Sequence, residues 1–247
     1  MLTYNACGIE LAAITPGEAT AQIIDAARMR NRLEVHLCNA YTLSLVDTDP
    51  VLRAALRDAH LNLPDGAPVA WLGRHVGLRS PVRGPALLGS VMEAGVAHRI
   101  RHYLYGGKPS IAREMARRLM LKFPGVEIVG TESPPFHDLD TEALEELSRR
   151  IRESEAHVVW VGLGTPRQDH LVPRLSRELG LPVIPVGAAF DFWSGHVAEA
   201  PAVLHGTGLE WMYRFAKEPR RLWRRYLIGN PRFVRNVLRH RRLSLDP

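Results

Sequence analysis

The stretch VVWVGLGTPRQ, residues 158–168, decides the fold. Its first four residues are all apolar, so both faces of a strand formed there are hydrophobic. That pattern is typical of a central parallel strand that is covered by helices on both sides. Two glycines follow, and a helical pattern begins directly after them. A buried strand that passes through a glycine turn into a helix is the repeating unit of a doubly wound α/β sheet.

The same alternation of β-rich runs and amphipathic helical stretches continues on both sides of residues 158–168. The predicted strands are Glu34–Cys38, Tyr103–Tyr105, Val126–Val129, His157–Gly162 and Val183–Val186. The predicted helices are Pro16–Arg30, Pro50–Ala59, Leu87–His98, Ser110–Lys122, Thr141–Glu153 and Arg167–Leu179. The sequence therefore predicts an α/β fold with a doubly wound, mostly parallel, Rossmann-like sheet. We expect one domain over residues 1–206 and a basic helical C-terminal appendage over residues 207–247.

Positive charge is concentrated in the appendage. The chain has a formal net charge of +6, yet residues 214–242 contain eleven basic residues and one acid, a charge of +10, so the remainder carries −4. The basic residues are Arg214, Lys217, Arg220, Arg221, Arg224, Arg225, Arg232, Arg235, Arg239, Arg241 and Arg242. A localised basic block indicates an anionic partner, either phospholipid or nucleic acid.

Two helical stretches are expected in the appendage, with a break at Gly229-Asn230-Pro231. Apolar side chains share one face of each stretch: Trp211, Phe215, Leu222 and Tyr226 on the first, and Phe233, Val234, Val237 and Leu238 on the second. Arginines occupy the opposite face of the second stretch: Arg232, Arg235, Arg239 and Arg242. This pattern favours a helix in a lipid headgroup layer, although a helix packed on the domain with a solvated basic face gives it too.

Composition excludes several classes of protein. Hydrophobic residues make up 46% and charged residues 23%, as in a packed globular protein. Only Cys7 and Cys38 are present, and the 11 histidines show no H-E-x-x-H spacing, so neither a disulfide framework nor a zinc site is expected. The N-terminus has no secretory-signal pattern, and no apolar run approaches the ~20 residues of a spanning helix. We expect a cytoplasmic protein, peripheral on the inner face of the plasma membrane.

Loops rich in glycine and polar residues follow several predicted strands, where ligands bind in doubly wound sheets. In LPDGAP, residues 63–68, Asp65 stands between proline and glycine just before an apolar helix. The local pattern favours Asp65 as the N-cap of that helix. The alternative is a carboxylate directed at a substrate hydroxyl.

Three further glycine turns are candidates for ligand binding. In GLGTPRQD, residues 162–169, backbone N–H groups at a helix start favour phosphate, Arg167 adds charge and Gln168 can bind a hydroxyl. The full G-x-G-x-x-G fingerprint is not present. The turn YGGKP, residues 105–109, also precedes a helix. In GAAFDFWSG, residues 187–195, the aromatic residues either stack on a base or sugar or pack in the core.

Asp47-Thr48-Asp49 matches the D-x-D pattern with which many sugar transferases hold a metal. Asp49 precedes Pro50 at a predicted helix start, an arrangement typical of an N-cap followed by proline, and capping is the favoured interpretation. We therefore predict no metal and no cofactor. A bound diphosphate would be held by glycine-loop N–H groups and by arginines of the appendage.

Taken together, these motifs resemble those of the WecG/TagA/CpsF family, glycosyltransferase family 26, from about Leu33 to Tyr226. The resemblance rests on Asn39, the Arg83-Gly84 turn, LPDG at 63–66, LYGGK at 104–108, FPG at 123–125, IVG at 128–130, GLGTPRQ at 162–168, GAAFDF at 187–192, GLEWMYR at 208–214 and EPRRL at 218–222. So many short motifs in one order are hard to obtain by chance.

The resemblance implies an inverting transferase that moves N-acetylmannosamine or glucose from a UDP-sugar to a polyprenyl-diphosphate-linked saccharide in bacterial cell-surface polysaccharide synthesis. It also implies that Asp65 is the catalytic base, that Gln168 lies by the sugar, and that the appendage closes the site and meets an anionic membrane. The expected substrate-binding residues are Asn39, Arg83, Gly106, Gly107, Lys108, Gly162, Gly164, Pro166, Arg167, Gly187, Phe190, Asp191, Arg214, Arg220, Arg221 and Arg224. The sequence leaves a homo-oligomer open.

The chain departs from the family pattern at four positions, which bear on the donor sugar more than on the fold. Ala86 stands where an aspartate is common, Glu199 where an arginine is common, Asp169 where a glutamate is common, and Leu37 where some members have threonine. Two rival functions are a catalytically silent accessory subunit of another glycosyltransferase and a nucleic-acid-binding protein. The second leaves the loops of Asp65 and Gln168 unexplained, so no nucleic-acid partner is expected.

Overall fold

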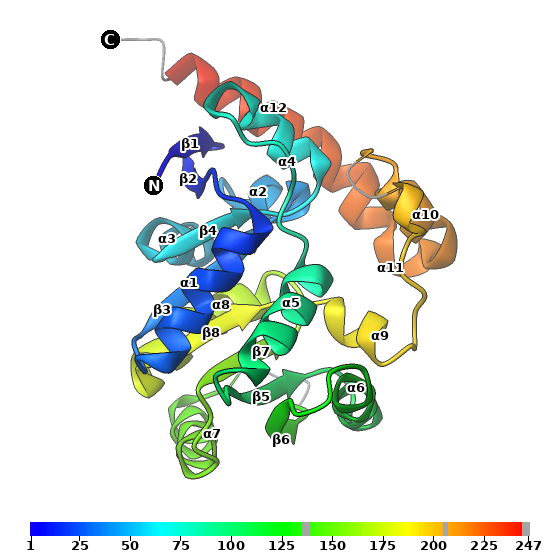
Figure 1. Cartoon of the computed structure of the whole chain (residues 1–247). Coiled ribbons are helices and arrows are strands. Elements are labelled where there is room, and N and C mark those ends of the chain that lie inside the picture. Colours follow the sequence, from blue (N-terminus) through cyan, green and yellow to red (C-terminus); the bar gives the residue numbers. More distant parts are fainter. Residues whose placement is uncertain (135–138, 205–206, 244–247) are drawn as a thin grey trace.

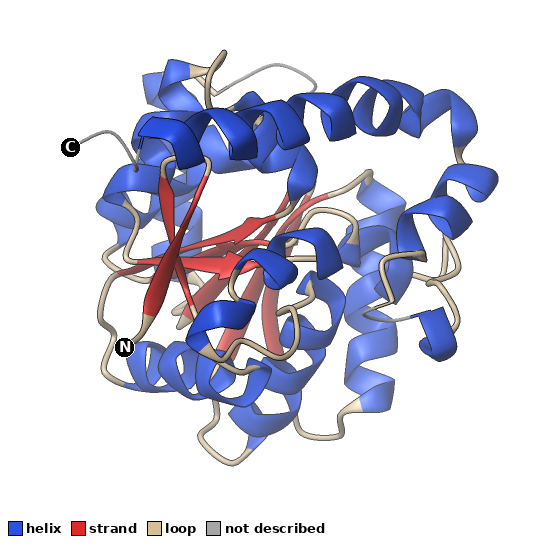
Figure 2. Ribbon diagram, turned by 90° about the horizontal axis from the view of Figure 1, so that it is seen from above, coloured by secondary structure: helices blue, strands red, loops and turns tan. Residues whose placement is uncertain are grey.

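Six parallel strands form the central sheet in a computed structural model, which describes residues 1–134, 139–204 and 207–243 (Figures 1 and 2). Across the sheet the order is β4 (Leu61–Pro64), β3 (Leu33–Cys38), β8 (Pro182–Pro185), β7 (Val158–Gly162), β5 (Arg101–Gly106) and β6 (Glu127–Glu132). The predicted doubly wound α/β class is confirmed. For Ala202, Arg221, Arg242 and Leu243 the structure describes the backbone and not the side chain.

Strand β7 lies between β8 and β5, and its side chains alternate between two hydrophobic cores. Val158 and Trp160 belong to one core, whereas Val159 and Val161 belong to the other. The first core includes residues of α1 (Pro16–Arg28), α5 (Gly84–Val96), α6 (Pro109–Lys122) and α9 (Ala189–Trp193), and the second those of α7 (Thr141–Glu153) and α8 (Arg167–Leu179). Because both faces of the strand are covered, its sequence is apolar at consecutive positions.

A third core was not foreseen from the sequence. It joins the hairpin of β1 (Thr3–Ala6) and β2 (Ile9–Ala12) to α2 (Ala40–Leu45), α3 (Pro50–Asp58) and α4 (Ala67–Leu72). The apolar helix expected after Asp65 is α4. Apart from α3 and α4, these elements, together with β4 and α9, are four to six residues long and were missed, because segments so short show too few repeats of a periodic pattern. Two 3₁₀ turns cover Arg74–Val76 and Ala202–Leu204.

The appendage contains α10 (Glu210–Lys217), α11 (Pro219–Trp223), a π-helical turn (Arg224–Ile228) and α12 (Gly229–Leu243). The predicted break at residues 229–231 is wrong: the chain stays helical from Pro219 to Leu243, and the interruption lies at Glu218. The π turn, in which the Gly229 N–H bonds to the Arg224 carbonyl, comes just before Pro231. It accommodates the missing N–H of the proline without ending the helix.

Helix α12 lies along α2 and reaches the β1–β2 hairpin (Figure 1). Phe233 is buried in the third core, and Asn236, fully buried, donates to the carbonyls of Leu43 and Ser44 at 3.2 and 3.3 Å. The inner face of α12 therefore packs on the domain, as the second interpretation of its pattern held. Val234 and Leu238 remain more than half exposed.

The predicted division of the chain into a domain and an appendage is left untested. Its boundary at residue 206 lies outside the described residues, so the division stays a prediction. Within the described ranges, no helix is long and apolar enough to cross a bilayer.

Candidate active site

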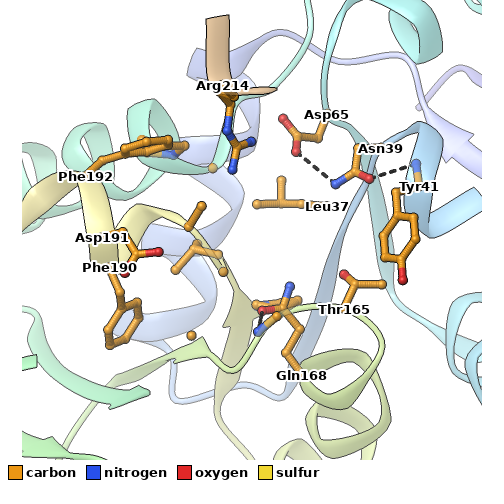
Figure 3. A pocket seen from close by; sticks show the side chains of 18 of the residues that line it. Leu37, Asn39, Tyr41, Asp65, Thr165, Gln168, Phe190, Asp191, Phe192 and Arg214 are labelled. Carbon is orange, nitrogen blue, oxygen red and sulfur yellow. Dashed lines mark hydrogen bonds between the residues drawn. The ribbon is translucent and has the colours of Figure 1, made fainter. Parts of the chain in front are cut away.

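A cavity of about 520 Å³ opens beyond the carboxyl ends of β3, β4, β7 and β8, and residues of the appendage complete its wall (Figure 3). Its volume falls within the range of ~300–1,000 Å³ that is typical of small-molecule sites. Doubly wound sheets bind their ligands at this end of the strands. The loops singled out in the sequence therefore meet in one place.

Asp65 follows β4 and is directed into this cavity. The N-cap of α4 is Gly66, which makes no side-chain capping bond, so the prediction that Asp65 caps the helix is wrong. Its Oδ2 instead accepts a hydrogen bond from Asn39 Nδ2 at 3.4 Å. Burial raises the pKa of the Asp65 carboxyl above its ordinary value, while the charge of Arg225 and the Asn39 hydrogen bond oppose that rise.

Asn39 is held in place by a helix end. Its Oδ1 accepts from the backbone N–H groups of Tyr41 and Thr42, both at 3.1 Å, so that Asn39 is the N-cap of α2. These bonds fix which side of the amide faces the helix. The Nδ2 group is thereby directed at Asp65 (Figure 3).

Gln168 lies in the first turn of α8, on the far side of the cavity from Arg214 (Figure 3). Its Oε1 accepts from the Gly164 N–H at 3.0 Å, which fixes the amide. Gly187, with φ of +48°, lies against it, and a Cβ there would come within 3.3 Å of Oε1. Two of the predicted loops thus pack around this one side chain.

The glycines at the ends of β5 and β7 allow close packing. A Cβ on Gly106 would lie 2.6 Å from the Gly162 backbone, and a Cβ on Gly162 would lie 2.3 Å from the ring of Phe190. The Gly107 N–H donates to the Gly162 carbonyl at 3.1 Å. These contacts account for the three glycines by packing, and their role toward phosphate stays a prediction.

Among the described side chains, three arginines of the appendage line the site: Arg214, Arg224 and Arg225. Arg214 of α10 lies over the Phe192 ring at 5.3 Å, and its buried Nε and Nη2 atoms have no hydrogen-bond partner among the described residues. Arg225, in the π turn, lies over the Tyr41 ring at 5.3 Å. Burial, followed by the nearby charge of Arg214, lowers the pKa of Arg225. Partly buried cations that line a cavity favour an anionic ligand.

Most of the predicted site residues line the cavity: Asn39, Asp65, Arg83, Gly107, Gly162, Gly164, Gln168, Gly187, Phe190, Asp191, Arg214 and Arg224. Five others that the structure describes do not: Gly106, Lys108, Pro166, Arg167 and Arg220. The side chain of Arg221 lies outside the described part of the chain. Sequence reasoning missed several lining residues, among them Tyr41, Phe192, Glu199, Glu210 and Arg225.

Arg83 is already engaged with two carboxylates. Its Nη2 lies 2.5 Å from Glu199 Oε1 and 3.0 Å from Glu210 Oε2. Glu199, which stands where arginine is common in the family, therefore provides an ion-pair partner for Arg83. Through Glu210 the same guanidinium ties α5 to α10 of the appendage.

Two other departures also lie at or under the site. Leu37 lines the cavity, so the wall is apolar where some members of the family have a hydroxyl. Asp169 is fully buried, and its Oδ1 lies 3.0 Å from His36 Nδ1. This pair joins α8 to β3 next to Gln168.

The D-x-D segment is engaged in structural contacts. Asp49 accepts from the Leu52 N–H at 2.9 Å, which confirms it as the N-cap of α3. Asp47 lies 2.5 Å from Arg53 and 3.1 Å from His240 of α12. Within the described part of the chain, no group of three or more His, Cys, Asp or Glu residues could hold a metal. The absence of a metal requirement stays a prediction.

Comparison with known proteins gives three findings. The family described as "Glycosyl transferase WecG/TagA/CpsF family" matches residues 4–246. The N-acetylglucosaminyldiphosphoundecaprenol N-acetyl-beta-D-mannosaminyltransferase of Bacillus spizizenii is 32% identical over 202 residues, which cover 81% of this chain and 76% of that protein. A mutant arylmalonate decarboxylase in its sulfate-associated form aligns with 79% of this chain and 83% of its own, at 16% identity and a TM-score of 0.28.

Proposed function

Because the chain belongs to the WecG/TagA/CpsF family of glycosyl transferases, we propose that it transfers a hexose, N-acetylmannosamine or glucose, from a UDP-sugar to a saccharide on polyprenyl diphosphate. The name of the Bacillus relative supports N-acetylmannosamine and this class of acceptor. The observation that carries the proposal is the convergence of Asp65 with Arg214 and Arg225 of the appendage in one cavity.

In the proposed reaction, Asp65 takes the proton of an acceptor hydroxyl while that oxygen attacks the anomeric carbon. The bond from this carbon to the UDP oxygen breaks, UDP leaves with the electron pair, and in-line displacement inverts the anomeric centre. A carboxyl whose pKa is raised by burial is a stronger base than an ordinary aspartate. Asn39 orients it through the hydrogen bond to Oδ2.

Negative charge develops on the diphosphate as the sugar leaves. Arg214 has buried N–H groups without a partner among the described residues, and Arg224 lines the same cavity. Cations that are already oriented in a site of low dielectric stabilise such charge without a metal. The reaction would take place on the inner face of the plasma membrane, where the appendage meets anionic lipid and a polyprenyl-linked acceptor is within reach.

Substitution of the base tests the proposal. Asp65→Asn keeps the shape of the side chain and the contact with Asn39 but cannot accept the proton. We expect transfer to a lipid-linked acceptor to fall by ~10²-fold or more, while UDP still binds. Turnover of Asp65→Asn close to that of the wild type would contradict the role of Asp65. Wild-type protein that binds UDP but transfers no sugar, across a panel of UDP-sugars, would favour the silent accessory subunit.

Metal independence is tested separately on the wild type. Asp47 and Asp49 are engaged with Arg53, Leu52 and His240, so we expect activity to survive exhaustive chelation with EDTA. Activity that vanishes with EDTA and returns with manganese or magnesium would contradict this prediction.

A further inference from the structure

A second cavity, of about 290 Å³, adjoins the larger one. The two cavities share several lining residues: Asn39, Tyr41, Asp65, Glu210, Arg214 and Arg225. Asp65 therefore faces both. A group bound in the second cavity would approach the proposed base from a different direction than a donor in the first.

The character of the second cavity changes along its length. At Asp65 and Arg225 it is charged, whereas the rest is lined by apolar and aromatic side chains such as Pro68, Trp211 and Phe233. The ring of Trp211 lies 5.4 Å from that of Tyr226, which also lines the wall. A binding site with a charged inner end and an apolar remainder suits an amphipathic ligand.

The cavity also leads toward solvent along an apolar path. Val234 lines it and is 54% exposed. Leu227, Val234 and Leu238 follow one another at helical spacing, and Leu227 and Leu238 are 63% and 56% exposed. An apolar chain that leaves the cavity past Val234 would pass along this stripe.

We propose that the second cavity binds the polyprenyl diphosphate end of the acceptor. The diphosphate lies at Arg225, the first isoprene units lie along Trp211, Phe233 and Val234, and the acceptor hydroxyl reaches Asp65. Arg225 is suited to this role because no carboxylate lies within ion-pair distance of it among the described residues. This inference rests on the proposed function and adds to it where the lipid-linked substrate binds.

The chemistry of the lining favours an isoprenoid over the nucleoside of the donor. A nucleobase needs hydrogen-bonding partners for its polar edges, whereas the outer part of the cavity is mainly Ala67, Pro68, Trp211, Phe233 and Val234. Isoprene units have no polar atoms and bind to such a wall by burial of apolar surface alone. The appendage therefore forms part of the acceptor site itself.

The test compares two acceptors in detergent, where docking on a membrane does not contribute. Both have the same saccharide and diphosphate, one ending in several isoprene units and the other in a methyl group. Val234→Asp places a charge on the wall, and Trp211→Ala removes an aromatic surface. Val51→Asp is the matched control, because Val51 of α3 is equally exposed and lines neither cavity.

For Val234→Asp and Trp211→Ala we expect the KM of the isoprenyl acceptor to rise about tenfold. The KM of the methyl acceptor, the KM of the UDP-sugar and the melting temperature should not change, and Val51→Asp should match the wild type. Equal effects on both acceptors, or a raised KM for the UDP-sugar, would overturn the inference and assign the cavity to another part of the reaction. A wild type that uses neither acceptor would instead contradict the proposed function.

Discussion

The charges of Asp65 and Arg225 influence each other across the two parts of the chain, although the two groups form no ion pair. The groups that face Asp65 are Asn39, Arg214, Arg225 and Glu210, and the charge of Arg225 is the strongest influence that lowers its pKa. The charge of Glu210 raises the pKa of Asp65, as burial does. The ionised, proton-accepting form of Asp65 is therefore favoured by an arginine that the appendage supplies.

Arg225→Gln should move the pH profile of the reaction. Without the positive charge, the pKa of Asp65 rises further, so a larger share of the protein carries a protonated, inactive Asp65 at a given pH. We expect the acid limb of kcat against pH to shift to higher pH. Arg235→Gln, which changes the same charge at an exposed position, is the control. If the acid limb does not move in Arg225→Gln, the charge of Arg225 does not influence the ionisation of Asp65.

The residues of the site could be predicted only where a short motif contains them. Asp65 and Gln168 stand in glycine turns after strands, and that position alone marks them. Arg225 was missed because Arg224 and Arg225 are neighbours in a basic segment, and the π turn that sets their directions has no signature in the sequence. Helix capping was favoured for Asp65 because the sequence pattern reports only on neighbouring residues. The contact with Asn39 joins the loops after two different strands, and a local pattern does not reveal it.

At the scale of elements, α2 connects the appendage to Asp65, the proposed base. Asn39 caps its N-terminus, and Asn236 of α12 donates to the carbonyls of Leu43 and Ser44 near its C-terminus. A helix of six residues is too short to be stable alone, so its position depends on these two side chains. The packing of α12 is thereby linked to the orientation of Asn39 toward Asp65.

Asn236→Ala should destabilise the protein. The substitution removes two hydrogen bonds from a fully buried site and leaves carbonyls of α2 without partners, which costs about 1–3 kcal/mol. We expect a lower melting temperature in a thermal scan. The matched variant Arg235→Ala, at the neighbouring exposed position, should melt like the wild type. If Asn236→Ala melts at the wild-type temperature, α12 is not held to α2 by this contact.

The elements that the sequence predicted well are long and have a clear period. α1, α6, α7 and α8 have 13 or 14 residues, enough for several helical turns, and their predicted bounds agree with the structure to within a few residues. The prediction of a helix break at residues 229–231 was wrong, because the sequence does not show whether the turn before Pro231 can adopt a π-helical form and keep the helix continuous. The buried face of α12 was ambiguous for a related reason: an amphipathic pattern does not identify the partner of the apolar side.

At the scale of the whole molecule, charge and exposed apolar surface lie on the same segment. Residues 214–242 have a charge of +10 against −4 for the rest of the chain, and Leu227, Ile228, Val234 and Leu238 in this segment are 40–63% exposed. α12 carries this surface across one side of the molecule (Figure 1). A basic surface with exposed apolar side chains is typical of a helix that lies on an anionic membrane.

Deletion of the appendage is a poor test of membrane binding, although the sequence alone would recommend it. The deletion would remove Phe233 and Asn236, both buried against the domain, so the remaining chain would lose part of its core. Substitutions of exposed residues avoid that loss. Arg232, Arg235 and Arg241 are exposed on α12 and suit this purpose, whereas Arg239 lies 3.3 Å from Asp47 and helps to hold the helix.

The triple variant Arg232→Gln, Arg235→Gln, Arg241→Gln should therefore bind vesicles with anionic phospholipid more weakly. Each arginine near the surface contributes up to ~1 kcal/mol, so the loss can reach ~10²-fold in the partition coefficient at low salt. Wild-type binding should weaken as salt rises, because the Debye length shrinks from ~10 Å at 0.1 M to ~3 Å at 1 M.

The control variant replaces Arg57, Arg79 and Arg177, which are exposed on the domain, and lowers the net charge equally. Equal vesicle sedimentation of the two triple variants would show that net charge, and not this face of α12, governs binding. If transfer to a methyl-diphosphate acceptor is unchanged in the α12 variant while vesicle binding falls, these arginines serve the membrane and those at Asp65 serve the reaction.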